Sequence, residues 1–187
     1  MKLRVLAVAV AGMLLLTAAH AQTFTAKLTG FQETAAVVST GTGTARITIN
    51  DNETISYELS YSGLQGGNVL FAHIHVGQRN VAGGVAIFFC GGGKSAATQA
   101  ACPAIPGPAG TVSGTVSGTW SASDIVGPTS QGVDPTNPHN ENAFARLVTA
   151  IKAGRSYANV HTTRSPGGEI RGQFVRRHDD DRDDDDD

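Results

Sequence analysis

The sequence has few charged and aromatic residues and lacks several motifs of common enzymes. Charged residues make up only 16% of the chain, and residues 22 to 175 carry nine Lys or Arg against eight Asp or Glu. This balance provides no basic footprint for nucleic acid. The chain also lacks a Gly-x-Ser-x-Gly nucleophile motif and the complete phosphate-binding pattern of Gly, four residues, then Gly-Lys followed by Ser or Thr. Its acidic residues are scattered, and their spacing predicts no catalytic pair.

Long apolar runs are also absent, except for one at the N-terminus. Lys2 and Arg4 precede an apolar run from Val5 to Leu16, and the small-residue sequence Ala19-His20-Ala21 follows. This order is typical of a secretory signal peptide cleaved after Ala21. No second long apolar run follows, so we expect no transmembrane segment after cleavage. The sequence therefore predicts a secreted or periplasmic protein.

Three regions follow from these patterns: a signal peptide over residues 1–21, one domain over 22–175 and an acidic tail over 176–187. The tail carries three Arg and eight Asp, and it has nothing to bury in a core. We expect it to be disordered and solvated. A weak divalent-cation or mineral-surface role is the alternative, although the carboxylates are not spaced as a calcium loop.

The domain shows the alternation of apolar residues that is typical of half-buried strands. Gly-rich turns separate these short segments, so the fold class is predicted to be all-β, an antiparallel β-sandwich of about eight strands. One segment has helical spacing instead, with a cap at residues 140–142 and an end at Gly154. We expect this single short helix to cover one end of the sandwich. The predicted strands contain or span residues 24–28, 45–49, 55–61, 69–76, 84–90, 111–120, 157–162 and 169–175.

Only two cysteines are present, Cys90 and Cys102, and they bracket a Gly- and Ala-rich segment. In an oxidising compartment an even pair of this kind predicts a disulfide that closes a long loop. Thiolate ligation of a metal is the alternative. It requires more Cys or His residues near this loop than the sequence supplies.

Histidines give the most informative pattern. His73 and His75 occupy positions i and i+2 of a predicted strand, so both imidazoles face the same way. His161 lies on another predicted strand, and strands far apart in sequence can be neighbours in a sandwich. Three imidazoles on adjoining strands favour copper or zinc over calcium or magnesium. The alternative is structural: each imidazole forms hydrogen bonds with the backbone or a carboxylate such as Glu169.

A charged segment, Gly168-Glu169-Ile170-Arg171, follows a predicted Gly-Gly turn. In the simpler interpretation Glu169 and Arg171 pair with neighbours and stabilise the last strand. In the other interpretation Arg171 lies near the histidines and guides or orients an anion there.

Three segments together carry a family resemblance: FTAKLTGFQET near the start, AHIHVG in the middle and GRSYANVHTTRSPGGEIRGQF at the end. In this order they resemble the CHRD domain, first described in chordin and common in exported bacterial proteins. The resemblance extends from about Phe24 to Phe174. It implies an extracellular immunoglobulin-like or superoxide-dismutase-like β-sandwich, and it implies no settled activity.

A looser likeness is to copper/zinc superoxide dismutase, whose strands carry an HxH copper pair, a later copper histidine and an arginine near the C-terminal end. By this likeness His73, His75 and His161 match copper ligands, and Arg171 matches the anion-guiding residue. Residues 76 to 138 contain no histidine, so the bridging and zinc ligands are missing. His139 alone does not restore that pattern.

Three functions therefore remain open. The first is a non-enzymatic exported module that binds an unidentified protein or surface or has a structural role. The second is a copper- or zinc-binding protein that uses His73, His75 and His161, for storage or delivery. The third is a redox or hydrolytic enzyme, for which the sequence provides no catalytic partners.

Overall fold

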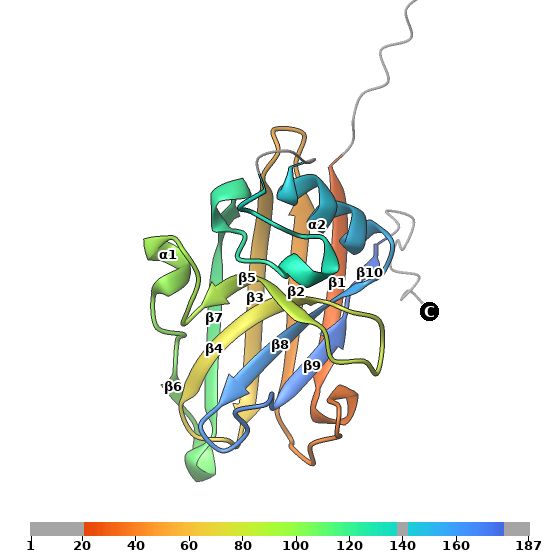
Figure 1. Cartoon of the computed structure of the whole chain (residues 1–187). Coiled ribbons are helices and arrows are strands. Elements are labelled where there is room, and N and C mark those ends of the chain that lie inside the picture. Colours follow the sequence, from red (N-terminus) through yellow and green to blue (C-terminus); the bar gives the residue numbers. More distant parts are fainter. Residues whose placement is uncertain (1–20, 138–141, 178–187) are drawn as a thin grey trace, which may run out of the picture.

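The computed structural model describes residues 21–137 and 142–177, which contain one antiparallel sheet of ten strands (Figure 1). The strand order is β5-β4-β8-β9-β1-β2-β3-β7-β6, and β10 pairs with β1. The strands are β1 (Gln22–Thr29), β2 (Thr42–Ile49), β3 (Ile55–Leu64), β4 (Val69–Val76), β5 (Gly84–Cys90), β6 (Ile105–Pro106), β7 (Val112–Trp120), β8 (Ser156–Thr162), β9 (Ile170–Gln173) and β10 (Val175–Arg176). The helices are α1 (Ala96–Gln99) and α2 (Ala143–Lys152), with short 3-10 turns at Gly30–Gln32, Pro108–Gly110, Ala122–Asp124 and Thr129–Gln131.

The sheet curls so that its two halves lie face to face, with β4, β5, β8 and β9 in front of β1, β2, β3 and β7 (Figure 1). Contacts between the halves confirm the two layers. The ring of Tyr57 on β3 lies 5.5 Å from that of Phe89 on β5, and Trp120 at the end of β7 donates its indole N–H to the carbonyl of Phe88 at 2.8 Å. The predicted all-β, sandwich-like fold is therefore confirmed.

The core lies between the two halves because apolar residues alternate along each strand. Phe24, Ala26 and Leu28 of β1 are at most 2% exposed, and Ile47, Leu59 and Ile74 are fully buried. Full burial of a Leu, Ile or Phe side chain contributes about 1.5–3 kcal/mol to folding. The core therefore supplies the main force that holds the curled sheet closed.

Cys90 and Cys102 form the predicted disulfide. Cys90 ends β5, which is one edge of the sheet, and Cys102 precedes β6, which is the other edge. The bridge therefore joins the two edges of the curled sheet. No free cysteine remains among the described residues, so thiolate ligation of a metal is excluded for the oxidised chain.

Helix α2 forms because its sequence caps its own start and buries one face. The Asn142 side chain accepts a hydrogen bond from the Phe144 amide at 2.9 Å, which satisfies an otherwise free donor of the first turn. Phe144, Leu147 and Ile151 are buried, and Gly154 adopts a positive φ of 68° just beyond the helix. As predicted, the helix covers one end of the sandwich (Figure 1).

The structure differs from the prediction in short elements. The predicted last strand is divided into β9 and β10 because Phe174 turns inward between them and is only 1% exposed. Helix α1 lies inside the disulfide loop and strand β6 lies just after it, and no apolar periodicity in the sequence marks either element.

The predicted signal peptide and the acidic residues after Arg177 lie outside the described residues, apart from Ala21. Among the described residues, no helix combines the length and the apolar character needed to cross a membrane.

The position of the disulfide predicts that its loss destabilises the domain. A bridge that closes a loop of this length stabilises a protein by about 3 kcal/mol. We expect the Cys90→Ala/Cys102→Ala variant to lose about 2–4 kcal/mol of unfolding free energy. Guanidinium unfolding of the oxidised protein, the reduced protein and the variant measures this. Equal midpoints for all three would show that the sheet edges hold without the bridge.

Candidate metal centre

The candidate site is formed by the outer faces of β4, β8 and β9. Antiparallel pairing places Phe71 opposite His161, His73 opposite Asn159, and His75 opposite Tyr157. Because side chains alternate, Ala72 and Ile74 of β4 point into the core, while His73 and His75 point to the other face. One strand register therefore brings all three predicted histidines together.

This outer face is covered by loops rather than by another sheet. The segment 77–83 between β4 and β5 and the turn 165–168 between β8 and β9 both contact it. His73, His75 and His161 are consequently 3%, 8% and 6% exposed. Two register shifts in the β4–β5 pairing, on either side of His73 and Ile74, put Phe88 opposite His73. Such bulges re-aim side chains beside a site.

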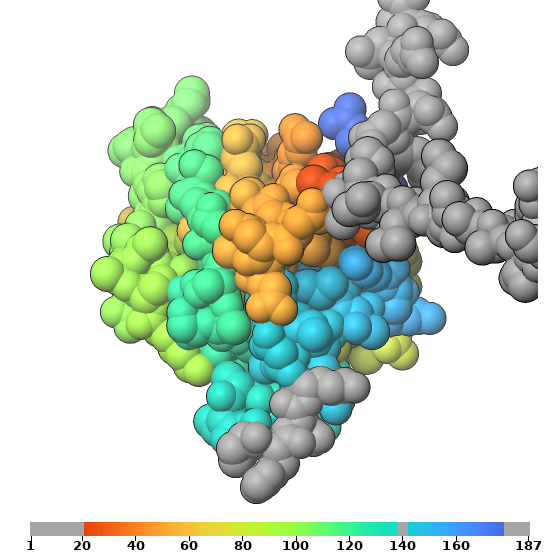
Figure 2. Space-filling view, turned by 90° about the horizontal axis from the view of Figure 1, so that it is seen from above, coloured from red at the N-terminus to blue at the C-terminus, as the bar shows by residue number. Residues whose placement is uncertain are grey.

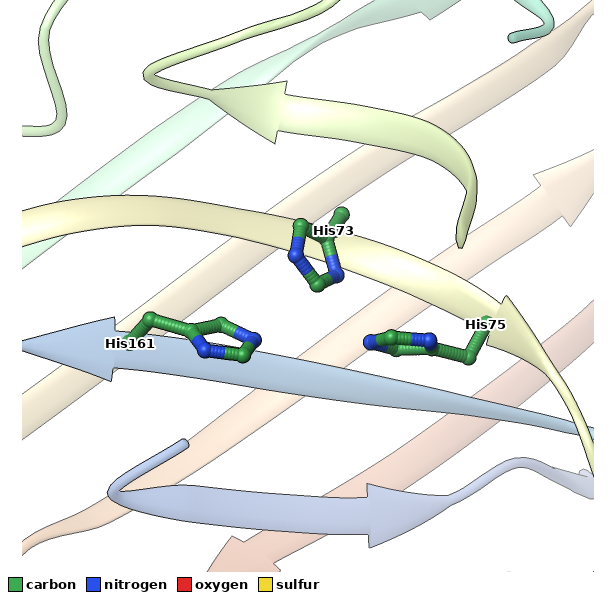
Figure 3. Close-up of side chains that lie close together, drawn as sticks. All are labelled: His73, His75 and His161. Carbon is green, nitrogen blue, oxygen red and sulfur yellow. The ribbon is translucent and has the colours of Figure 1, made fainter. Parts of the chain in front are cut away.

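The three imidazoles converge on one point. His75 and His161 face each other from opposite sides, and His73 lies between them above the gap (Figure 3). One ring nitrogen from each residue lies within 4.8 Å of the other two. The ring centroid of His73 is 4.4 Å from that of His75 and 4.5 Å from that of His161.

Backbone carbonyls fix the orientation of two of these rings. Nδ1 of His75 lies 2.8 Å from the carbonyl oxygen of Gly83, and Nδ1 of His161 lies 2.9 Å from that of Pro166. A carbonyl only accepts, so Nδ1 carries the proton in both rings and Nε2 carries a lone pair. These two Nε2 atoms and Nδ1 of His73 are buried and have no hydrogen-bond partner among the described residues.

Burial also keeps the three rings neutral. It lowers the pKa of His73 from 6.5 to about 2, with the neighbouring His75 and His161 adding to the effect. Burial likewise lowers the pKa of His75 to about 4, against the opposing effect of its hydrogen bond to Gly83. The pKa of His161 is lowered by burial too, partly offset by its hydrogen bond to Pro166. Neutral imidazole is the form that binds a metal.

Aromatic rings surround the histidines. Tyr157 stacks on His75 with centroids 4.5 Å apart and planes 10° from parallel. Phe71 stacks on His73 at 5.4 Å, and Phe88 meets His73 edge-on at 5.0 Å. The rings restrict the imidazoles to one orientation. The histidine group itself contains no carboxylate.

Arg171 packs on Tyr157, the ring that stacks on His75, and its charge contributes, after burial, to the lowered pKa of His75. Its guanidinium carbon lies 3.4 Å from the centre of the Tyr157 ring, and the group donates to the carbonyls of Gln78 and Val81 at 3.1 and 2.8 Å. The residue is 2% exposed. These contacts connect β9 to the loop that holds His75, and they favour the structural alternative over anion guidance.

Glu169 also has a structural environment. Its Oε1 accepts hydrogen bonds from the Ser39 hydroxyl and the Gln65 amide, and Oε2 accepts from the Gly66 amide and the Thr162 hydroxyl, all at 2.7–2.9 Å. Four donors thus satisfy a carboxylate that is only 1% exposed. Glu169 joins two loops to β8 and does not contact the histidine nitrogens.

Glu33 is a buried acid that the sequence does not single out. Burial raises the pKa of Glu33 to about 7, against the opposing effects of the Arg171 charge and a hydrogen bond with Asn159. Oε1 of Glu33 and Oδ1 of Asn159 are both buried acceptors without a partner. Glycine at position 168 leaves space for the Glu33 carboxyl group, since a Cβ there would lie 2.4 Å from Glu33 Oε1.

The contacts of Glu169 predict a large loss of stability in the Glu169→Gln variant. The new amide nitrogen would face two of these donors, so two buried or partly buried groups lose their acceptor and the amide itself gains none. Each unsatisfied buried group costs about 1–3 kcal/mol, so we expect a loss of about 3 kcal/mol. Urea unfolding measures it, with the exposed Glu58→Gln on β3 as the matched control. Equal losses in the two variants would contradict the assigned role.

The environment of Glu33 predicts a pH-dependent stability. Its folded pKa of about 7 lies above the ordinary 4.5, so its contribution is fully present below pH 4.5 and is lost as the pH rises through 7. A shift of this size, reduced for partial solvent screening, corresponds to on the order of 2 kcal/mol. We expect Glu33→Gln, which cannot ionise, to gain that much relative to the native protein between pH 5 and 8. A pH-independent difference in urea unfolding would refute this.

Comparison with known proteins agrees with the fold. No curated protein and no solved structure matches the chain. The family model of the CHRD domain matches residues 24–174, which covers the sandwich from β1 to the residue before β10. This match extends over most of the chain and includes all three histidines. The chain therefore belongs to the CHRD domain family.

Proposed function

We propose that this CHRD-domain protein is an exported, non-enzymatic binding module whose ligand is a copper ion held by His73, His75 and His161. The proposal rests on the convergence of the three rings, which brings one nitrogen of each within 4.8 Å of the other two. Each ring also has a buried nitrogen without a hydrogen-bond partner among the described residues. Storage or delivery of the metal is the role that such a module would serve.

The unpaired nitrogens distinguish this group from structural histidines. A buried polar atom normally has a partner, and one without a partner costs about 1–3 kcal/mol. Here His75 and His161 each form one hydrogen bond with a backbone carbonyl, which directs the other nitrogen to the common point. A hydrogen bond from the other ring nitrogen to a backbone carbonyl is typical of metal-bound histidines, because it fixes the tautomer and orients the ring.

The geometry and the donor type favour copper. Metal–nitrogen bonds of about 2.0–2.1 Å put two nitrogens on opposite sides of an ion about 4 Å apart. The three nitrogens here lie within 4.8 Å of one another, so each side chain needs to move by less than about 1 Å to coordinate an ion. Neutral imidazoles suit copper and zinc, and copper(II) binds such sites more tightly than zinc. Zinc usually takes four ligands, and no carboxylate or thiolate joins this group among the described residues.

Two further features support export and a passive role. The predicted signal peptide precedes β1 directly, and the disulfide fits an oxidising compartment. The side chains that pack around the nitrogens are Phe71, Phe88 and Tyr157, which supply no carboxylate for acid or base catalysis. These observations support binding rather than turnover.

The proposal predicts stoichiometric copper binding by the mature chain, residues 22–187. We expect one Cu(II) per chain, coordinated by three nitrogens in the electron paramagnetic resonance spectrum, and weaker binding of Zn(II). The His73→Ala/His161→Ala variant should bind copper at least about 100-fold more weakly, since it keeps one of three ligands. Isothermal titration and metal analysis after desalting measure both.

The matched control is His139→Ala/His178→Ala, which removes the same number of imidazoles outside the described residues. It should bind copper as the native chain does. Copper should also raise the melting temperature of the native chain and of this control, but not of the site variant, because only a site in the folded state gains stability from its ligand. Equal copper affinity in the site variant and the native chain would overturn the proposal.

A further inference from the structure

A groove lined by basic side chains lies outside the histidine site. Two adjoining hollows of about 640 and 350 Å³ form it, and they share Arg79, Gln173, Val175 and Arg176. The cations that line it are Lys27, Arg79, Lys152, Arg155, Arg176 and Arg177. They come from β1, the loop after β4, the end of α2, the residue before β8, and the end of β10 with the residue after it.

The charges are concentrated in this groove. Eleven Lys and Arg residues fall within the described ranges, and the five outside the groove are Arg46, Lys94, Arg146, Arg164 and Arg171. No Asp or Glu lines either hollow, and no described carboxylate pairs with any of the six cations. A concave surface of one charge sign attracts ions of the opposite sign.

The acidic tail begins at the edge of this groove. Strand β10 pairs with β1 through Phe24 and Arg176, and Arg177 donates its amide to the Thr23 carbonyl at 3.0 Å. Figure 2 shows the red start of β1 and the blue C-terminal end of the domain side by side. The chain after Arg177 is His178 followed by eight Asp and one Arg at positions 179–187. The carboxylates of the tail therefore come almost directly after Arg176 and Arg177, two cations of the groove, along the chain.

Tethering favours this segment over a free anion. The ten residues 178–187 span up to about 35 Å when extended, enough to follow a groove that starts where they are attached. A short tether gives a local concentration in the millimolar range. We propose that residues 179–187 bind in the basic groove and mask it as an anion-binding surface. Other polyanions gain access when the tail is displaced or neutralised.

This inference is independent of the copper site, because it needs neither the histidines nor a metal. Its first test uses a carbodiimide on the dilute mature chain, which joins a lysine amine only to a carboxylate in contact with it. We expect mass spectrometry to find tail crosslinks to Lys27 and Lys152 within monomers, and to lose them at about 1 M NaCl. Lys94, near α1 and outside the groove, is the control. Tail crosslinks to Lys94 at the same yield, or only between chains, would overturn the proposal.

The second test measures masking, with heparin as the polyanion probe. Replacing all eight tail Asp residues by Asn in the full chain should tighten heparin binding on the order of tenfold, if the tail otherwise occupies the groove nine-tenths of the time. Neutralising the tail also makes the whole chain more positive, which by itself favours heparin binding. The groove must therefore be tested by further substitutions within this neutral-tail variant. Adding Arg79→Gln/Arg176→Gln to the neutral-tail variant should abolish its gain in heparin affinity.

Adding Arg46→Gln/Arg164→Gln removes the same charge from exposed positions outside the groove and should leave most of the gain. Circular dichroism confirms that each variant is folded. Equal effects of the two arginine pairs would show that net charge alone drives heparin binding, and this would refute a defined groove. No gain from the neutral tail would refute the masking.

Discussion

The antiparallel register of β4 against β8 is the constraint on which the rest of the site depends. It places His161 opposite Phe71, two residues from His73 and four from His75 on the same face. Ala72, Ile74 and Val160 point into the core from the opposite face. A slip by one residue would exchange the two faces and bury the polar set in the sandwich. The apolar core therefore fixes the position of the histidines without contacting a ligand.

The loops over this outer face are held in two different ways. Glu169 accepts four hydrogen bonds and leaves no donor unsatisfied, which is how a native protein accommodates a buried carboxylate. Arg171 reaches loop 77–83 through two carbonyls and rests on Tyr157, and Gly83 of the same loop donates its amide to the Tyr157 hydroxyl. The three histidine nitrogens have no hydrogen-bond partner among the described residues, although Glu169 and Arg171 beside them are well satisfied. The proposed metal site rests on these nitrogens and on their convergence.

Much of the fold could be predicted from the sequence, because alternating apolar residues define a strand locally. The bounds of β4 and β5 agree with the predicted ranges, and Asn142 and Gly154 mark the ends of α2. The three histidines could be proposed as one group because two share a strand face. Their hydrogen-bond partners could not, since Gly83 and Pro166 lie in loops whose course depends on tertiary packing. Glu33 and Tyr157 were missed for the same reason. The basic groove was hidden by the near-neutral charge of the domain, which says nothing of how charges are distributed in space.

The distance in sequence between the two strands that carry the histidines has a consequence for how the proposed centre obtains its metal. His73 and His75 lie on β4, whereas His161 lies on β8, after the disulfide loop, β7 and α2. No partial chain that ends before β8 holds all three histidines, so the proposed centre forms only in the completed fold. If the chain is exported, as we propose, and crosses the membrane unfolded, it carries no ion in this centre during transport. The compartment in which it folds, and not the one in which it is made, would then decide which metal it binds.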